Sequence, residues 1–323
     1  MLRRDIKRWD LVLLMINSII GAGIFGLPSK VFSLTSVYSI FAMLFCALIV
    51  LIFTLIFSEV ASQFDRSGGP YLYTVDAFGR FPGFIIGWLT LVSRIAAYAA
   101  LINLLVDYLS YFSSAFIEGP LRALAIILIS FFLFFINSKS VKSSSYLNNT
   151  LAIVKLLPLL AFVLIGMFFI NPEYLKLTKD LPSVSSFSSS IVILVFAFTG
   201  WEAALINTGE MSNPAKNIPF AMIFSALFVA TFYILIQIVS IGTYPDLASS
   251  IKPIADAAGK FMGPVGGTLI TTGAVFAILG TLNAIVLAGS RLAFSFGEEK
   301  QFPKVFSRVN QKTGVPLLSL IVF

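Results

Sequence analysis

Eight mostly apolar segments, each near the length of a membrane-spanning helix, constrain this sequence more than any other feature. A helix needs about 20 apolar residues to cross the hydrocarbon core, where backbone polar groups must be satisfied within the segment. The segments comprise residues 11–28, 38–60, 84–112, 121–136, 151–170, 190–208, 218–241 and 265–296. A ninth begins at Val315 and reaches only Phe323, so we expect a chain that is truncated at its C-terminus. The pattern predicts an all-α integral membrane protein, with one multi-pass transmembrane domain over residues 1–323.

The composition fits lipid as the solvent and excludes several kinds of chemistry. Hydrophobic residues make up 58% of the chain and charged residues 11%. The sequence contains no His, which removes His-based catalysis and His-ligated metals, and its single Cys46 excludes a Cys-rich metal site. The net charge of +7 is distributed between apolar runs, unlike the basic patch of a nucleic-acid-binding protein. We expect no enzyme activity, no cofactor, no metal site and no nucleic-acid partner.

The N-terminal region is interpreted as a first transmembrane helix that is not cleaved off, with the N-terminus in the cytoplasm. Its basic start, apolar run and Gly-Ala-Gly also fit a signal peptide, but later segments are as strong and the glycines have another use. Loops on the same side as the N-terminus carry most of the Lys and Arg, including Lys139, Lys216, Lys300 and Lys304. The positive-inside rule then assigns this side to the cytoplasm. We expect a plasma membrane protein, which in a bacterium means the inner membrane.

Two of the segments contain glycine near their middle. Gly21-Ala22-Gly23 interrupts residues 11–28, and Thr199-Gly200 interrupts residues 190–208. Glycine costs about 1 kcal/mol relative to alanine inside a helix, and unwound backbone at membrane depth is tolerated only beside a cavity or inside protein. The two segments run in opposite directions through the membrane, as corresponding helices do in the inverted halves of transporters. Close helix packing is the alternative explanation for each glycine motif taken alone.

Two such breaks suit a ligand that carries both charges. Free N–H groups of Gly21, Ala22 and Gly23, at the positive end of a half-helix, can hold a carboxylate. Carbonyls released by the second break, together with that of Ile20, can accept hydrogen bonds from an ammonium group. An amino acid presents both groups a short distance apart. The breaks therefore predict a binding site for an amino acid substrate.

Four stretches resemble the amino acid-polyamine-organocation transporter family. They are IIGAGIFGLPS, SEVASQFDRSGGPYLYTVDAFG, FAFTGWEAALINTGEMSNPAKNIPFAM and GTLNAIVLAGSRLAFSFGEEKQFPKVF, in the family's order. One departure is Phe64-Asp65, where the family commonly has a proline before Gly-Gly-Pro, and we expect it to alter only loop geometry. The resemblance implies a LeuT-type inverted-repeat transporter bundle of two five-helix repeats. The first repeat would cover about residues 8–170, and an incomplete second repeat about residues 188–323.

The same resemblance implies roles for individual residues. Gly21 to Gly23 would face the substrate carboxylate, whereas Phe196, Ala197 and Thr199 would face its amino group. Phe196 would also close over the bound substrate as a gate. Lipid contact or core packing is the ordinary reason for a Phe on an apolar segment, and it stays the alternative here.

Burying an ionisable residue at membrane depth costs free energy, so each such residue within or beside the apolar segments is a candidate for a functional role. Glu59 and Asp107 lie near segment ends and are expected at the interface. Arg94 is deeper and is expected to pair with a carboxylate or with unwound carbonyls. Glu202 follows the second break, where it can brace the unwound backbone or carry a proton. Lys155 can snorkel to the interface or, as the resemblance implies, take the place of a sodium ion between helices 1, 5 and 8 and couple transport to protons.

The combined expectation is a secondary active transporter of amino acids that is driven by protons and works by alternating access. A substrate exchanger and a polyamine transporter stay as alternatives. A channel would more naturally show polar stripes along a pore. An intramembrane aspartyl protease would need two Asp residues at one depth, which Asp76 and Asp107 do not offer. The expected partners are an amino acid, protons and the lipid bilayer.

Overall fold

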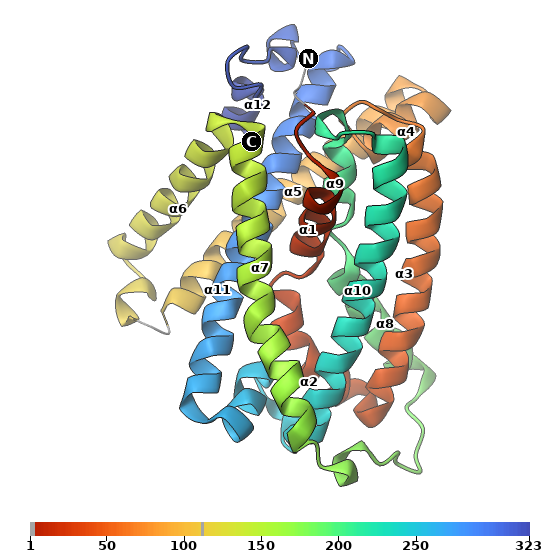
Figure 1. The fold of residues 1–323 in the computed structure, drawn as a ribbon, viewed down its shortest axis with the longest axis vertical. Helices are drawn as coiled ribbons and strands as arrows, with labels where there is room; N and C mark the ends of the chain where they lie inside the picture. The colour runs from red at the N-terminus through yellow and green to blue at the C-terminus, as the bar shows by residue number, and fades with distance from the viewer. Residues whose placement is uncertain (1–3, 111–112) are drawn as a thin grey trace.

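The structure, a computed structural model, describes residues 4–110 and 113–323 as a bundle of α-helices (Figure 1). The long helices are α3 (Ser39–Ser62), α5 (Arg80–Leu109), α6 (Pro120–Lys139), α7 (Val141–Gly166), α10 (Pro214–Thr243) and α11 (Pro253–Glu298). Within the described ranges, 7 helical stretches are long and apolar enough to cross a membrane. The β pairing found there is one isolated bridge between Ile6 and Met211. The predicted all-α membrane protein is confirmed.

Two of the predicted segments are each divided into two helices. The first gives α1 (Arg8–Ile19) and α2 (Gly23–Thr35), and the second gives α8 (Val184–Phe198) and α9 (Glu202–Ile206). Helices as short as α1 and α9 cannot span a bilayer alone, so their ends must be satisfied inside the protein. In Figure 1, α1 and α9 lie together in the upper centre of the bundle, and they are in contact.

Serine N-caps move two helix starts away from the predicted boundaries. The composition of residues 138–145 and 183–190 predicts connectors, but only Ser140 and Ser183 stand outside helices there. Ser140 Oγ accepts from the Ser143 N–H at 3.0 Å, and Ser183 Oγ accepts from the Ser186 N–H at 3.1 Å. A serine at this position satisfies an orphan N–H of the first turn, so α7 and α8 already begin within these two stretches.

The remaining elements are short. They are α4 (Pro70–Phe78), α12 (Leu317–Val322) and 3₁₀ turns at Ser36–Tyr38, Ser114–Phe116, Met167–Phe169, Pro172–Leu175, Thr208–Glu210, Leu247–Ser249 and Lys304–Ser307. The helix α4 lies between the predicted apolar segments 38–60 and 84–112. The helix α11 begins earlier than its predicted start at residue 265, and it bends at Gly263, where φ is 65°. Glycine adopts this left-handed value without steric cost, so the chain can turn there.

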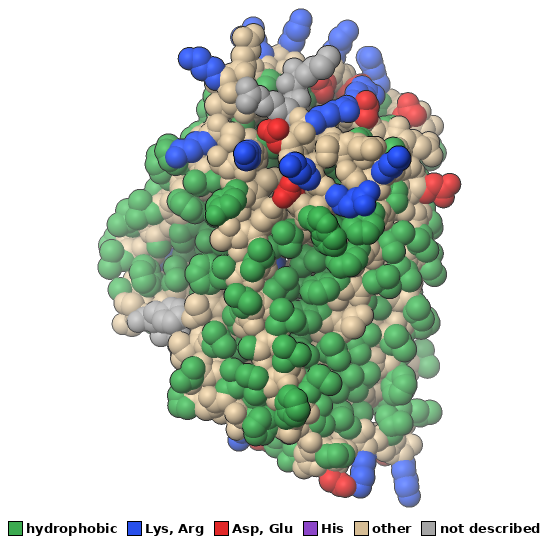
Figure 2. Space-filling view, viewed as in Figure 1, with side chains coloured by type: hydrophobic (Ala, Val, Ile, Leu, Met, Phe, Trp, Pro, Cys, Tyr) green, Lys and Arg blue, Asp and Glu red, His purple; other side chains and the backbone are tan. Residues whose placement is uncertain are grey.

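An apolar belt surrounds the bundle between two charged ends. Figure 2 shows hydrophobic side chains over the middle of one face, with charged side chains gathered at its ends and most of them near the N-terminus. On α3, α5 and α6, Ile52, Leu89 and Phe131 are 58%, 59% and 62% exposed. An exposed apolar area of this extent is costly in water but suits hydrocarbon. The chain is a multi-pass integral membrane protein.

A buried ion pair connects the turn after α9 to α11. Arg291 Nη2 lies 2.8 Å from Glu210 Oε1, and Arg291 Nε donates to the same oxygen at 2.9 Å. Neither residue has exposed surface. Ile6 also pairs here, since its N–H donates to the Glu210 carbonyl and its carbonyl accepts from the Ser212 N–H. Removing one partner of such a buried pair lowers the free energy of unfolding by about 3–5 kcal/mol, so the pair holds the turn after α9 against α11.

Candidate functional site

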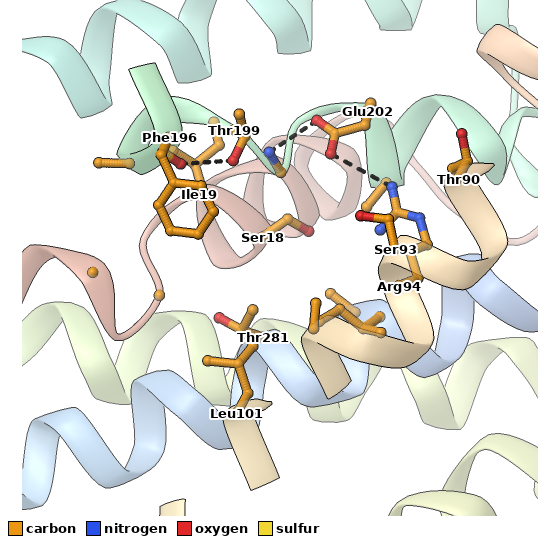
Figure 3. Close-up of a pocket in the computed structure, with 18 of the residues that line it drawn as sticks. Ser18, Ile19, Thr90, Ser93, Arg94, Leu101, Phe196, Thr199, Glu202 and Thr281 are labelled. Atoms are coloured by element: carbon orange, nitrogen blue, oxygen red, sulfur yellow. Dashed lines mark hydrogen bonds and ion pairs between the residues drawn. The ribbon is translucent and has the colours of Figure 1, made fainter. Parts of the chain in front are cut away.

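A cavity of about 510 Å³ lies where the two helix breaks meet α5 and α11 (Figure 3). This volume is within the range of small-molecule binding pockets. Its wall includes Ser18, Gly21, Ala22, Gly23, Thr90, Ser93, Arg94, Phe196, Ala197, Thr199, Gly200, Glu202 and Thr281. The predicted site residues of the two breaks, except Ile20, therefore come together in one cavity wall.

The first break leaves backbone N–H groups without partners at the cavity wall. The backbone turns sharply at Ile20, with φ −75° and ψ 87°, the geometry of an inverse γ-turn. The Gly21 N–H therefore donates to the Ile19 carbonyl at 2.9 Å and is not free as predicted. Among the described residues, the N–H groups of Ala22 and Gly23 have no acceptor. They lie at the positive N-terminus of α2, where an anion is favoured.

The second break is held by contacts to the first and by its own side chains. Gly200 has φ 121°, and a Cβ at this position would collide with the carbonyl oxygen of Ser18. The Gly200 N–H donates to Glu202 Oε2 at 2.9 Å. Thr199 Oγ1 donates to the Phe196 carbonyl at 2.6 Å. Glu202 thus braces the unwound backbone, one of the two roles expected for it from the sequence.

Tyr233 of α10 joins the two breaks from behind. Its hydroxyl lies 3.3 Å from the carbonyl oxygens of both Ile19 and Ala197, and its side chain is fully buried. A carbonyl oxygen has two lone pairs, so the Ala197 carbonyl can still accept from a ligand. The Phe196 carbonyl already accepts from both the N–H and the hydroxyl of Thr199. No sequence pattern indicated that Tyr233 would take part.

Lys155 of α7 contacts the end of α1 and is not part of the cavity wall. Its ammonium donates to the Asn17 carbonyl at 2.7 Å and to the Ile20 carbonyl. The side chain is 0% exposed, which does not fit snorkelling to the interface. Ile20 is also 0% exposed and is absent from the cavity wall. Its carbonyl, predicted to accept from the substrate, is engaged by Lys155 instead.

Of the other charged residues in the apolar segments, Arg94 lies at the cavity, whereas Asp107 and Glu59 are exposed. Arg94 Nη2 lies 3.6 Å from Glu202 Oε1 across the cavity wall, so Arg94 has the carboxylate neighbour expected for it. Asp107 is paired with Arg122 at 2.7 Å, and its side chain is 57% exposed. Glu59 is exposed as well. The expected interfacial position fits Asp107 and Glu59.

Replacing Gly200 with Ala is expected to destabilise the fold by about 2 kcal/mol or more. The added methyl group would meet the Ser18 carbonyl, and the backbone would keep a left-handed φ that L side chains rarely adopt. The melting temperature of the purified protein measures this effect. Gly259→Ala is the matched control, because a Cβ on Gly259 meets nothing within 4 Å. Equal melting of the Gly200→Ala protein and the parent would contradict the close contact between the two breaks.

The geometry defines a class of protein. Two interrupted helices that meet at a cavity inside an α-helical membrane bundle are typical of secondary transporters. The family model described as "Amino acid permease" matches residues 6–323, and the chain belongs to that family. It is a secondary amino acid transporter and not an enzyme.

Relatives and one solved structure agree with this assignment. The Serine/threonine exchanger SteT of Bacillus subtilis (strain 168) is 29% identical over 94% of this chain and 70% of that protein. The Methylthioribose transporter of the same organism is 28% identical over 98% and 72%. The b(0,+)-type amino acid transporter 1 of Mus musculus is 25% identical over 100% and 68%. The fold also matches a crystal structure of MhsT in complex with L-phenylalanine, with a TM-score of 0.65 and 15% sequence identity. The match covers 98% of this chain and 76% of the MhsT chain. This last likeness shows the LeuT-type fold.

Proposed function

We propose that the substrate is an amino acid bound between the two helix breaks and carried by alternating access. The free N–H groups of Ala22 and Gly23 hold its carboxylate, and the Ala197 carbonyl and Thr199 face its ammonium group. The proposal depends on one observation, the presence in one cavity wall of unpaired donors at a helix N-terminus and of backbone acceptors from a second break. The backbone of an amino acid presents the complementary charges.

Phe196 is the gate of this site. Its side chain is 77% exposed and lies in the cavity wall, beside Thr199 (Figure 3). An aromatic ring with so little packing can swing over the substrate and exclude water from it. Such a closure would commit the substrate before the helices rearrange, as gating elements do in other proteins.

The N-terminus lies in the cytoplasm, and the protein resides in the plasma membrane, the inner membrane of a bacterium. The positive-inside rule supports this orientation, because Lys and Arg side chains gather at the N-terminal end of the bundle (Figure 2). The chain comprises one repeat over α1 to α7 and a second that begins with α8. The breaks after α1 and after α8 take corresponding positions in these repeats.

The driving force is a proton gradient, with Lys155 as the coupling residue. This assignment is supported by the Lys155 ammonium group, which donates to the carbonyls of Asn17 and Ile20 at the broken end of α1. Exchange of one amino acid for another is the second candidate. It is favoured by the likeness to an exchanger of serine and threonine.

Uptake into proteoliposomes tests the proposal and separates the two candidates. Vesicles loaded with unlabelled amino acids are expected to take up a labelled amino acid transiently and saturably. In empty vesicles without sodium, an acidic exterior drives accumulation by a proton symporter but not by an obligate exchanger. Absence of counterflow for every amino acid would contradict amino acid transport. Preference for a polyamine, which lacks a carboxylate, would contradict the role of Ala22 and Gly23.

A further inference from the structure

A pair of opposite charges stands in the cavity wall away from the gate. Arg94 comes from α5 and Glu202 from α9, and both residues line the cavity. Figure 3 shows them on one side of the cavity and Phe196 on the opposite side. Thr90 and Ser93 lie beside the pair and add two hydroxyl groups to the wall. The cavity therefore has a charged and polar end opposite Phe196.

The Arg94 guanidinium has N–H donors that no group in residues 4–110 and 113–323 satisfies. Its side chain is 9% exposed, and its Nε is buried without a hydrogen-bond partner among the described residues. The nearest carboxylate oxygen, Glu202 Oε1, lies 3.6 Å from Nη2, which is too far for a hydrogen bond. A guanidinium group carries five N–H donors and no acceptor. A buried guanidinium without hydrogen bonds, at the wall of a cavity, is available to a ligand.

Only one of the two carboxylate oxygens of Glu202 accepts a hydrogen bond among the described residues. Its Oε2 accepts from the Gly200 N–H at 2.9 Å, whereas Oε1 accepts no hydrogen bond within the described part of the chain. The side chain is 32% exposed. One end of the cavity thus presents unmet donors and an unmet acceptor within a short distance of each other.

We infer that Arg94 and Glu202 bind the side chain of the substrate and select a neutral side chain that both accepts and donates a hydrogen bond, a carboxamide or a hydroxyl. The inference rests on the proposed function, since the helix breaks must hold the backbone of the amino acid. The oxygen of such a side chain accepts from Arg94, and its N–H or O–H donates to Glu202 Oε1. Bonds to charged partners are stronger than bonds between neutral groups.

The same pair disfavours the other classes of side chain. A carboxylate side chain is attracted by Arg94 but repelled by Glu202. An ammonium side chain is attracted by Glu202 but repelled by Arg94. An apolar side chain displaces water from both charged groups and leaves them without partners in a partly buried site. The pair is neutral as a whole, so it adds no net charge that would favour an ionic substrate.

Binding of matched amino acids to the purified full chain tests the inference. The probes are L-threonine against its isostere L-valine, and L-glutamine against L-glutamate, with L-lysine as the cation, each followed by ligand-induced thermal shift. We expect L-threonine and L-glutamine to bind about 10- to 100-fold more tightly than their counterparts and than L-lysine. Equal affinity for L-threonine and L-valine would overturn the inference while leaving the proposed function intact. A protein that binds none of these amino acids would overturn both.

Substitution of the arginine assigns the preference to a residue. Arg94→Gln is expected to lose most of the preference for L-threonine over L-valine, because it removes the charged donors. Arg122→Gln is the matched control, since Arg122 pairs with Asp107 at 2.7 Å outside the cavity and should keep the full preference. An Arg94→Gln protein that weakens L-threonine and L-valine by the same factor would show a structural role and contradict the assignment.

Discussion

A Gly23→Val protein is expected to insert and fold like the parent but to bind amino acids at least about 100-fold more weakly. A Cβ on Gly23 meets nothing within 4 Å, so the larger side chain enters open space and not the packed core. That space is the cavity beside the N–H groups of Ala22 and Gly23. An isopropyl group there excludes the substrate carboxylate and blocks charge-assisted hydrogen bonds, each worth about 1.5–3 kcal/mol. Thermal shift with a panel of amino acids measures the loss.

Gly26→Val is the control for this substitution. Gly26 lies one turn further along α2, its Cβ would also meet nothing within 4 Å, and it is not part of the cavity wall. Both variants make the same exchange of a glycine of α2 for a β-branched residue, so they differ in where the new side chain points and not in its size. We expect Gly26→Val to bind normally. Normal binding by the Gly23→Val protein would remove the basis for placing the carboxylate at this break.

The helix breaks were predictable because glycine lowers helix propensity locally. Gly21-Ala22-Gly23 and Thr199-Gly200 lower helix propensity within a few residues, and the structure interrupts the helices at these places. What the sequence could not supply was the backbone path through each break. The γ-turn at Ile20 uses the Gly21 N–H and turns the Ile20 carbonyl toward Lys155, a consequence of three-dimensional packing between α1 and α7.

The identity of long-range partners was the other part that the sequence could not supply, although a carboxylate partner was expected for Arg94. Arg94 and Glu202 are 108 positions apart by number, and Arg291 and Glu210 are 81 apart. Pairing across such separations depends on the rotation of each helix about its axis, which apolar composition on nearly all faces does not encode. The prediction of connectors at the two Ser-rich stretches, residues 138–145 and 183–190, was inaccurate for a different reason. Serine is common both in connectors and at N-caps, and only the hydrogen bond to the first turn distinguishes the two uses.

A Lys155→Ala protein is expected to lose uphill uptake driven by a pH gradient while retaining part of its exchange activity. The Lys155 ammonium donates to the carbonyls of Asn17 and Ile20, at the negative end of α1. No carboxylate among the described residues pairs with it, so these carbonyls are its stabilising partners. Movement of α1 during the transport cycle would remove them. Any such movement is linked to the proton on Lys155, because a state that changes the affinity for the proton is itself biased by the proton.

The decisive measurement compares accumulation and counterflow in the same sodium-free proteoliposomes, with an acidic exterior for accumulation and equal pH for counterflow. Lys142→Ala is the matched control, because Lys142 lies on the same helix α7 but is exposed, and it should behave like the parent in both assays. Loss of accumulation with surviving counterflow in Lys155→Ala separates coupling from substrate binding, since a misfolded protein would lose both. If Lys155→Ala concentrates substrate as well as the parent does, Lys155 only packs against the end of α1. The coupling group would then have to be sought at Glu202, the carboxylate in the cavity wall beside the second break.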